Sequence, residues 1–178
     1  PRLLEEQLEA LKRRAEKQGG RGRSRRGADL RPRRTDALRR LDSRGMLPAI
    51  YFLFSRAACE DSVGFCRKER LRFTTPEEAA SIESYIDEKV SPLSDADLEC
   101  LDYAGFRTAL ASGVAAHHAG ALPLFKEAVE ELFAAGLIKV VFATETLALG
   151  INMPARSVII ESLTKWNGEE HRPLTSGE

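Results

Sequence analysis

The sequence predicts an α/β fold built on an open, parallel sheet. Three short apolar runs, at residues 47–54, 138–143 and 157–162, are rich in β-branched and aromatic residues, as is typical of strands buried on both faces of a sheet. Segments with helical periodicity separate these runs, and such alternation indicates β–α–β crossover units. Residues 113–117 are expected to add a further short strand.

Capping residues, prolines and the 3.6-residue apolar period predict the helices between the strands. Thr35 is expected to cap the first helix, and Gly45 is expected to end it. Thr75 is a strong helix start, because proline and two glutamates follow it. Further helices are expected over residues 56–69, 76–89, 95–111 and 123–135.

Charge is divided unevenly along the chain, although the formal net charge is zero. Residues 1–44 hold 15 Lys and Arg against 7 Asp and Glu, whereas residues 45–178 hold 12 against 20. Residues 18–34 are rich in Gly and Arg and bury too little apolar surface to become ordered. We therefore expect a basic, largely disordered segment over residues 1–34 and a folded domain over residues 35–178. The basic segment is either a solvated tether or an arm that attracts phosphates.

Cysteine spacing and hydropathy exclude several classes of protein. Cys59, Cys66 and Cys100 form neither a CxxC pair nor an even disulfide set, which fits reduced thiols in a cytoplasmic protein. Together with the histidines they match no zinc-ligand spacing, so no metal site is expected. The apolar runs are too short to span a bilayer, so no membrane partner is expected. The start at Pro1, without a leader, favours an internal piece of a longer polypeptide.

Polar side chains follow three of the expected strands, at the edge where open α/β sheets bind their ligands. These segments are FSR at residues 54–56, HHAG at 117–120 and TETLALGINMP at 144–154. Small hydroxyls and free backbone N–H groups at a strand-to-helix junction suit an oxyanion such as phosphate. Thr144 would serve equally well as a helix N-cap, so chemistry alone leaves both interpretations open.

Four blocks of this sequence resemble the superkiller-like DExH-box helicases of superfamily two. FATETLALGINMPAR, residues 142–156, resembles motif V, and PAIYFLFSRAACE, residues 48–60, resembles motif IV. Residues 114–145 resemble the segment that leads into motif V, and KWNGEEHRPLTSGE resembles the stretch before motif VI. The match covers residues 35–178 and is most similar to bacterial HelY-type members, which often carry a basic linker before motif IV. It implies a RecA-like, P-loop-NTPase-type sheet, namely the second motor domain, incomplete at its C-terminus.

The resemblance also implies a set of site residues, and it assigns no catalytic residue to this chain. It places Gly150 and Asn152 beside the nucleotide, in the cleft between two motor domains. It assigns nucleic-acid contacts to Ser55, Arg56, His118, Gly120, Lys126, Thr144 and Thr146. Ordinary structural roles remain open for several of them. Arg56 and Lys126 would also fit as solvated charges, and His117 and His118 as strand-end packing with one ring buried and one exposed.

The implied cofactors, ATP and Mg²⁺, need groups that this sequence lacks. No GxxxxGK[ST] loop and no DExH box occurs in it, and in this family both belong to the first RecA-like domain of the same polypeptide. The chain also ends before the arginines of motif VI. Alone it is therefore expected to be inactive, while in the whole protein it would supply one wall of the ATP cleft and part of the track for RNA or another single strand.

Two other classes of function compete with the helicase interpretation. A non-catalytic nucleic-acid-binding module with a degenerate motor fold would show salt-sensitive binding that ATP does not affect. An unrelated doubly wound enzyme, such as a nucleotide-sugar transferase, would need a catalytic constellation of its own, and the sequence shows none.

Overall fold

The computed structural model describes residues 33–148, 153–162, 164–166 and 171–173. The basic segment predicted to be disordered lies outside these residues, apart from its last two positions. No helix among the described residues is long and apolar enough to cross a membrane.

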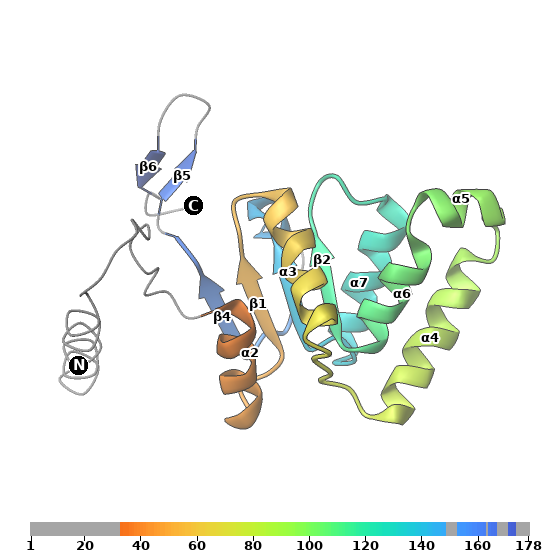
Figure 1. Ribbon diagram of the computed structural model, residues 1–178, viewed down its shortest axis with the longest axis horizontal. Helices are drawn as coiled ribbons and strands as arrows, with labels where there is room; N and C mark the ends of the chain where they lie inside the picture. The colour runs from red at the N-terminus through yellow and green to blue at the C-terminus, as the bar shows by residue number, and fades with distance from the viewer. Residues whose placement is uncertain (1–32, 149–152, 163, 167–170, 174–178) are drawn as a thin grey trace, which may run out of the picture. The chain divides into compact units, whose positions relative to one another are not determined.

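A four-stranded parallel sheet forms the centre of the described chain (Figure 1). Its strands are β1 (Ala49–Phe52), β2 (Val114–His117), β3 (Val140–Ala143) and β4 (Ser157–Ile160), in the order β2-β3-β1-β4. All neighbouring pairs are parallel, which confirms the predicted α/β fold class. Two further short strands, β5 (Thr164–Trp166) and β6 (His171–Pro173), form a separate antiparallel pair that the sequence patterns did not predict.

Helices pack on both faces of this sheet. They are α2 (Arg34–Ser43), α3 (Arg56–Lys68), α4 (Pro76–Val90), α5 (Asp95–Cys100), α6 (Tyr103–Ala111) and α7 (Pro123–Ala134), and a 3₁₀ helix, η1, spans Glu145–Ala148. One apolar cluster joins the side chains of Tyr51 and Phe142 to α2 and α3. A second cluster joins Ile50 and Val141 to α4 and α7. This alternation along β1 and β3 is the arrangement expected of a sheet buried on both faces.

The predicted start of helix α4 is confirmed in atomic detail. The hydroxyl of Thr75 accepts the N–H of Glu78 at 3.2 Å, and the Glu78 carboxylate accepts the N–H of Thr75 at 2.9 Å. This reciprocal pair is a capping box, which satisfies two otherwise unpaired donors. Lys139, just before β3, also donates to Glu78 at 2.7 Å, so the cap ties α4 to the sheet.

The prediction that Thr35 caps the first helix is wrong. The helix begins one residue earlier, at Arg34, and Thr35 is a buried residue of its first turn. The early start allows the guanidinium of Arg34 to donate to both carboxylate oxygens of Glu161, at 3.0 and 2.7 Å, and to Ser62 at 3.0 Å. Arg34 and Glu161 are 127 positions apart in the sequence, so the contact that accompanies this helix start is not a local one.

The single helix predicted over residues 95–111 is divided into α5 and α6. Asp102 separates them in the left-handed conformation, with φ of 47° and ψ of 44°. A residue in this conformation cannot continue a right-handed helix, so the chain turns and starts α6 in a new direction.

Strand β4 is only partly buried, although residues 157–162 were predicted to form a fully buried strand. Val158 is 59% exposed and Ile160 is 49% exposed. The reason is the position of β4 at the edge of the described sheet, where β1 is its one neighbour.

The three cysteines are free thiols. Cys59 and Cys66 are buried on α3, where burial raises the pKa of each thiol to about 12. Both are therefore protonated packing groups at neutral pH. Cys100, on α5, is exposed.

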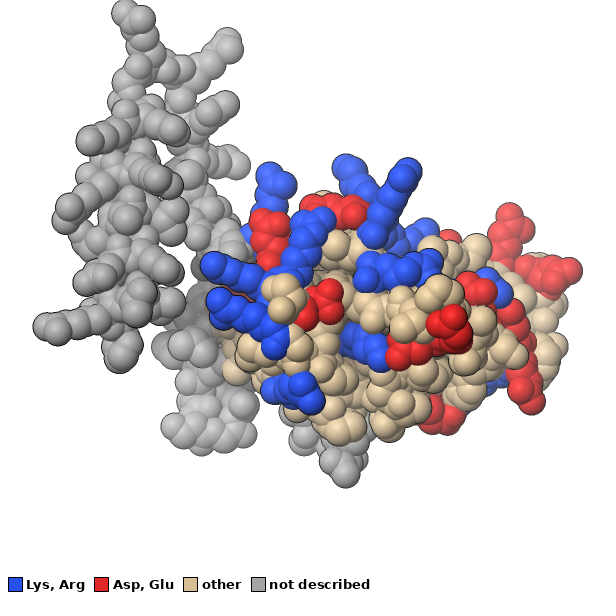
Figure 2. All heavy atoms as spheres, turned by 90° about the horizontal axis from the view of Figure 1, so that it is seen from below, with Lys and Arg blue, Asp and Glu red and all other residues tan. Residues whose placement is uncertain are grey.

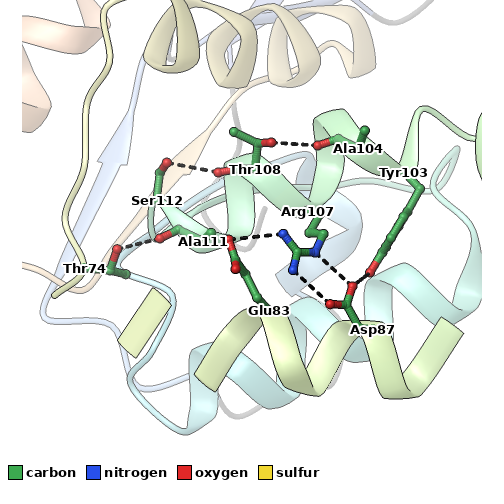
Figure 3. A network of polar contacts seen from close by, with 9 residues as sticks. All are labelled: Thr74, Glu83, Asp87, Tyr103, Ala104, Arg107, Thr108, Ala111 and Ser112. Carbon is green, nitrogen blue, oxygen red and sulfur yellow. Dashed lines mark hydrogen bonds and ion pairs between the residues drawn. The ribbon is translucent and has the colours of Figure 1, made fainter. Parts of the chain in front are cut away.

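Helices α4 and α6 are joined by a polar network centred on Arg107 (Figure 3). Its guanidinium donates two hydrogen bonds to Asp87, both at 2.9 Å, and approaches Glu83 at 3.2 Å. Tyr103 donates its hydroxyl proton to the same aspartate. These donors hold the pKa of Asp87 below its usual range, with the Arg107 hydrogen bonds as the main cause.

Asp87→Asn is expected to lower the unfolding free energy by about 1 kcal/mol at neutral pH, a value limited by the partial exposure of the pair. Because the folded state lowers the pKa of Asp87, this stabilisation is present above the unfolded pKa and is lost as the pH falls through the folded value. Urea titrations of the wild type and the variant between pH 7 and about pH 3 measure the difference.

The matched control is Glu88→Gln, an exposed carboxylate on the same helix with no ion pair among the described residues. It should change stability by less than about 0.5 kcal/mol. A loss for Asp87→Asn that stays constant down to the lowest pH would contradict the electrostatic origin of the effect.

Candidate nucleic-acid interface

The carboxyl ends of strands β1, β2 and β3 lie side by side, because all three are parallel and in register. Ala143 pairs with Phe52 on one side and with His117 on the other. The pairing continues past the strands: Leu53 donates its N–H to the carbonyl of Ala143 at 2.8 Å, and Thr144 donates its N–H to that of His117 at 3.2 Å. The three polar segments singled out in the sequence therefore leave the sheet at the same end, where the strands have their carboxyl termini; this end is called the carboxyl edge below.

Arg56 and Gly120 come into contact at this edge. A methyl group at Gly120 would lie 3.3 Å from Cδ and 3.4 Å from Nη1 of Arg56, so the arginine side chain lies across the glycine. Arg56 is exposed, and it has no ion-pair partner in the part of the chain that the structure describes. An exposed, unpaired guanidinium held against a turn is available to an anion.

His118 orders the turn that contains Gly120. The N–H of Gly120 donates to Nδ1 of His118 at 3.1 Å, and Nε2 of the ring lies 2.7 Å from Oε1 of Glu60 on α3. With Nδ1 accepting, the neutral ring carries its proton on Nε2 and donates it to Glu60. Both ring nitrogens are thus engaged within the protein and the ring is buried, so His118 supports the turn instead of facing solvent.

His117 is also buried, so the expectation of one buried and one exposed histidine is wrong. Its Nε2 lies 2.6 Å from Oε1 of Glu130 on α7. Its Nδ1 is buried without a hydrogen-bond partner in the described part of the chain. The two adjacent rings therefore bind carboxylates of helices on opposite faces of the sheet, which the sequence did not reveal. Glu60 and Glu130 stand 58 and 13 positions away, and no motif marks them.

Ser55 and Thr144 occupy junctions between a strand and a helix. Ser55 caps α3, where its hydroxyl accepts the N–H of Ala58 at 3.3 Å. Thr144 is half-buried directly after β3, and its carbonyl accepts the N–H of Leu147 at 3.1 Å. Leu147 is buried in the core and so anchors η1 at the strand end. Thr146 lies within η1.

Lys126, Gly150 and Asn152 are the remaining predicted site residues. Lys126 lies in the first turn of α7, partly buried and without an ion pair among the described residues. Gly150 and Asn152, expected at the nucleotide cleft, lie outside the described residues. No group of three or more His, Cys, Asp or Glu side chains in the described ranges could hold a metal ion.

Comparison with known proteins supports the resemblance seen in the sequence. No protein-family model matches the chain. It is 54% identical over 158 residues to the probable helicase HelY of Mycobacterium tuberculosis, an alignment that covers 89% of this chain and 17% of the relative. It is 43% identical over 147 residues to the chloroplastic DExH-box ATP-dependent RNA helicase DExH15 of Arabidopsis thaliana, covering 83% of this chain and 12% of that protein.

A third relative is the antiviral helicase SKI2 of Saccharomyces cerevisiae, 39% identical over 138 residues, with 78% of this chain and 11% of the yeast protein aligned. The chain thus spans 17–18% of the length of its HelY relatives and less of the others. Identity at this level over most of the chain, together with the parallel α/β sheet, shows that the chain belongs to the HelY and superkiller-type DExH helicases of superfamily two.

Proposed function

We propose that this chain is the strand-binding part of the second RecA-like domain of an ATP-dependent helicase. The observation that carries the proposal is the meeting of Arg56, the His118–Gly120 turn and Thr144 at one edge of the sheet. Each of the three comes from a block that resembles a helicase motif region. RNA is the proposed substrate, since two relatives are named RNA helicases.

In the proposed interface, the chain binds the backbone of a single strand. The guanidinium of Arg56 would donate paired hydrogen bonds to a phosphate, and the hydroxyl of Thr144, helped by Thr146, would bind a neighbouring one. Ser55 would contribute mainly by starting α3, and Lys126 would add long-range attraction. Such contacts fix the register of the strand and carry little base information, so a DNA strand would bind by the same groups.

ATP and Mg²⁺ are assigned chiefly to the first motor domain. The described residues supply no set of carboxylates for Mg²⁺, and no step of hydrolysis is assigned to them. Bound between the two domains, ATP would supply the free energy for strand movement, with Gly150 and Asn152 lining this chain's side of the cleft. The isolated chain would bind a strand weakly and hydrolyse nothing. We propose a cytoplasmic protein, on the ground of its free cysteines.

In the polypeptide that also carries the first motor domain, Thr144→Ala and Asn152→Ala are each expected to abolish most of the stimulation of ATPase activity by RNA. Each removes a polar group proposed to lie at the nucleic-acid track or at the ATP cleft, and Thr144 is only half-buried. The measurement is ATP hydrolysis with and without single-stranded RNA, alongside thermal unfolding. Unchanged stimulation in both variants would show that the site is assigned wrongly, and RNA binding that is insensitive to ATP would favour the non-catalytic module.

Arg56→Gln is expected to weaken binding of single-stranded RNA by roughly tenfold at low salt, because it removes one charge-assisted phosphate contact. Gly120→Ala should act in the same direction but less strongly, since its methyl group would crowd the Arg56 side chain and also Nδ1 of His118, at 3.3 Å. The losses should add only in part in the double variant, because both changes disturb the Arg56 guanidinium. Fluorescence anisotropy with a labelled oligonucleotide measures the affinity of the two single variants and of the double variant. Arg40→Gln, which removes one exposed positive charge from α2, is the control. Additive losses, or an equal loss in the control, would contradict the proposed contact.

A further inference from the structure

A basic hollow lies at the C-terminal end of α3, away from the carboxyl ends of the strands where the nucleic acid is proposed to bind. Its volume is about 680 Å³, and Arg67, Lys68, Arg70 and Arg72 line it together with Thr108 and Ser112 of the α6 region. Phe73, the next residue of the loop, donates its N–H to Ser112 just before β2 begins, so this hollow flanks the amino ends of the strands. Figure 2, which views the molecule from that side, shows most of the Lys and Arg over its left and upper parts, with some Asp and Glu between them, and further Asp and Glu at its right end.

The positive charge in this hollow is largely uncompensated. Arg67 approaches Asp102 at 3.9 Å, a long contact to a side chain that is 82% exposed. Lys68, Arg70 and Arg72 have no ion pair with any described residue. The two hydroxyls donate to backbone carbonyls, Thr108 to Ala104 and Ser112 to Thr108, so the cationic groups are the ones left to bind a ligand. Such a cluster repels itself unless an anion occupies it.

Arg70 occupies a backbone position that favours glycine. Five helices are followed, just after the C-cap, by a residue with positive φ; after α2, α6 and α7 that residue is a glycine, and after α5 it is Asp102. At the end of α3 the residue is Arg70, with φ of 52°, and Leu71 donates its N–H back to Cys66 at 2.9 Å as in the glycine-terminated α2. Glycine adopts this conformation without steric cost, whereas arginine does not. Arg70 therefore carries a steric cost at this position that a glycine would avoid.

A second hollow continues from the basic one along α3 and α6. The two share Gly64, Arg67 and Lys68, and the second reaches His118 and Gly120 at the other edge of the sheet. Phe65 lines it and is 52% exposed, although large aromatic side chains are usually buried. Glu60, Asp61 and Asp102 also line this second hollow, so the cationic surface is confined to its end at Arg67 and Lys68. A basic surface with an exposed aromatic ring near it is an arrangement that binds single-stranded nucleic acids, through phosphate contacts and base stacking.

We propose that the C-terminal end of α3 and the loop after it form a second contact for the phosphate backbone of a single-stranded nucleic acid. It is distinct from the proposed interface at the carboxyl ends of β1, β2 and β3. Lys68, Arg70 and Arg72 hold the phosphates, with Arg67 completing the cluster. Phe65 stacks on a base of the same strand where it runs along α3. Arginine predominates because its planar guanidinium can donate two parallel hydrogen bonds to one phosphate.

The test compares binding of a labelled oligouridylate to the 178-residue chain and to the variant Lys68→Gln/Arg70→Gly/Arg72→Gln, by anisotropy over a range of salt concentrations. Each lost phosphate contact lowers the slope of log K against log salt by about 0.7 for a single strand, so the triple variant should lose about 2 from the slope. Residues 1–32 are the same in both chains, so their contribution cancels. An unchanged affinity and slope would overturn the proposal.

Arg70→Gly alone separates binding from folding. It should weaken binding several-fold while leaving the melting temperature unchanged or higher, because glycine suits the backbone at this position. A lower melting temperature would show that arginine is retained for stability and would overturn the argument from its conformation. Arg40→Gln, which removes one exposed charge outside the hollow, should leave the slope unchanged. An equal loss in this control would mean that binding follows net charge and not this surface.

Two further measurements identify the partner. Phe65→Ala should weaken binding without changing the salt slope, since stacking releases no counterions. A poly-glutamate peptide of equal charge should bind at least tenfold more weakly than the oligouridylate. Equal binding of the peptide, lost in the same triple variant, would point to an acidic protein partner and overturn the nucleic-acid proposal.

Discussion

The structure depends on the burial of its central strand. Every side chain of β3, from Val140 to Ala143, is fully buried, and the strand pairs with β1 on one side and β2 on the other. Its two faces are not equivalent, since the Phe142 side packs on α3 and the Ala143 side on α7. A shift by one residue would move Phe142 out of the core on the α3 side and into the core on the α7 side, leaving a cavity in one and overpacking the other, so the register is strongly fixed. The alignment of the strand ends, and with it the candidate interface, follows from this register.

Two buried histidines fix the polar turn that follows β2. His117 and His118 are adjacent in sequence, and they bind carboxylates of α7 and α3 on opposite faces. The turn that follows them is thus held from both sides, and Gly120 within it lies against Arg56. Most of the polar groups at this edge position the backbone, and the exposed Arg56 is the group best placed to contact a ligand. This division is that of a rigid surface that binds an extended polyanion.

Local signals in the sequence predicted most of the elements and few of the contacts between them. The apolar runs predicted β1 and β3, and Thr75 predicted the start of α4. These signals are local, because strand burial and helix capping leave their pattern within a few residues. The helix start at Arg34 depends on Glu161, and the exposed side chains of β4 depend on its edge position. The break at Asp102 requires a left-handed backbone that non-glycine residues rarely adopt. The pairing of Arg56 with Gly120 is likewise set by sheet register, which no local pattern encodes.

The proposed interface is tested most directly by photo-crosslinking of this chain to single-stranded RNA that carries 4-thiouridine, followed by mapping of the crosslinked peptides. We expect crosslinks in the segments around residues 55–56, 117–120 and 144–146, which leave the sheet at the same end. These crosslinks should fall as salt is raised, because phosphate contacts supply most of the affinity. Crosslinks absent from all three segments, with binding retained elsewhere on the chain, would contradict the assignment of this edge as a nucleic-acid interface.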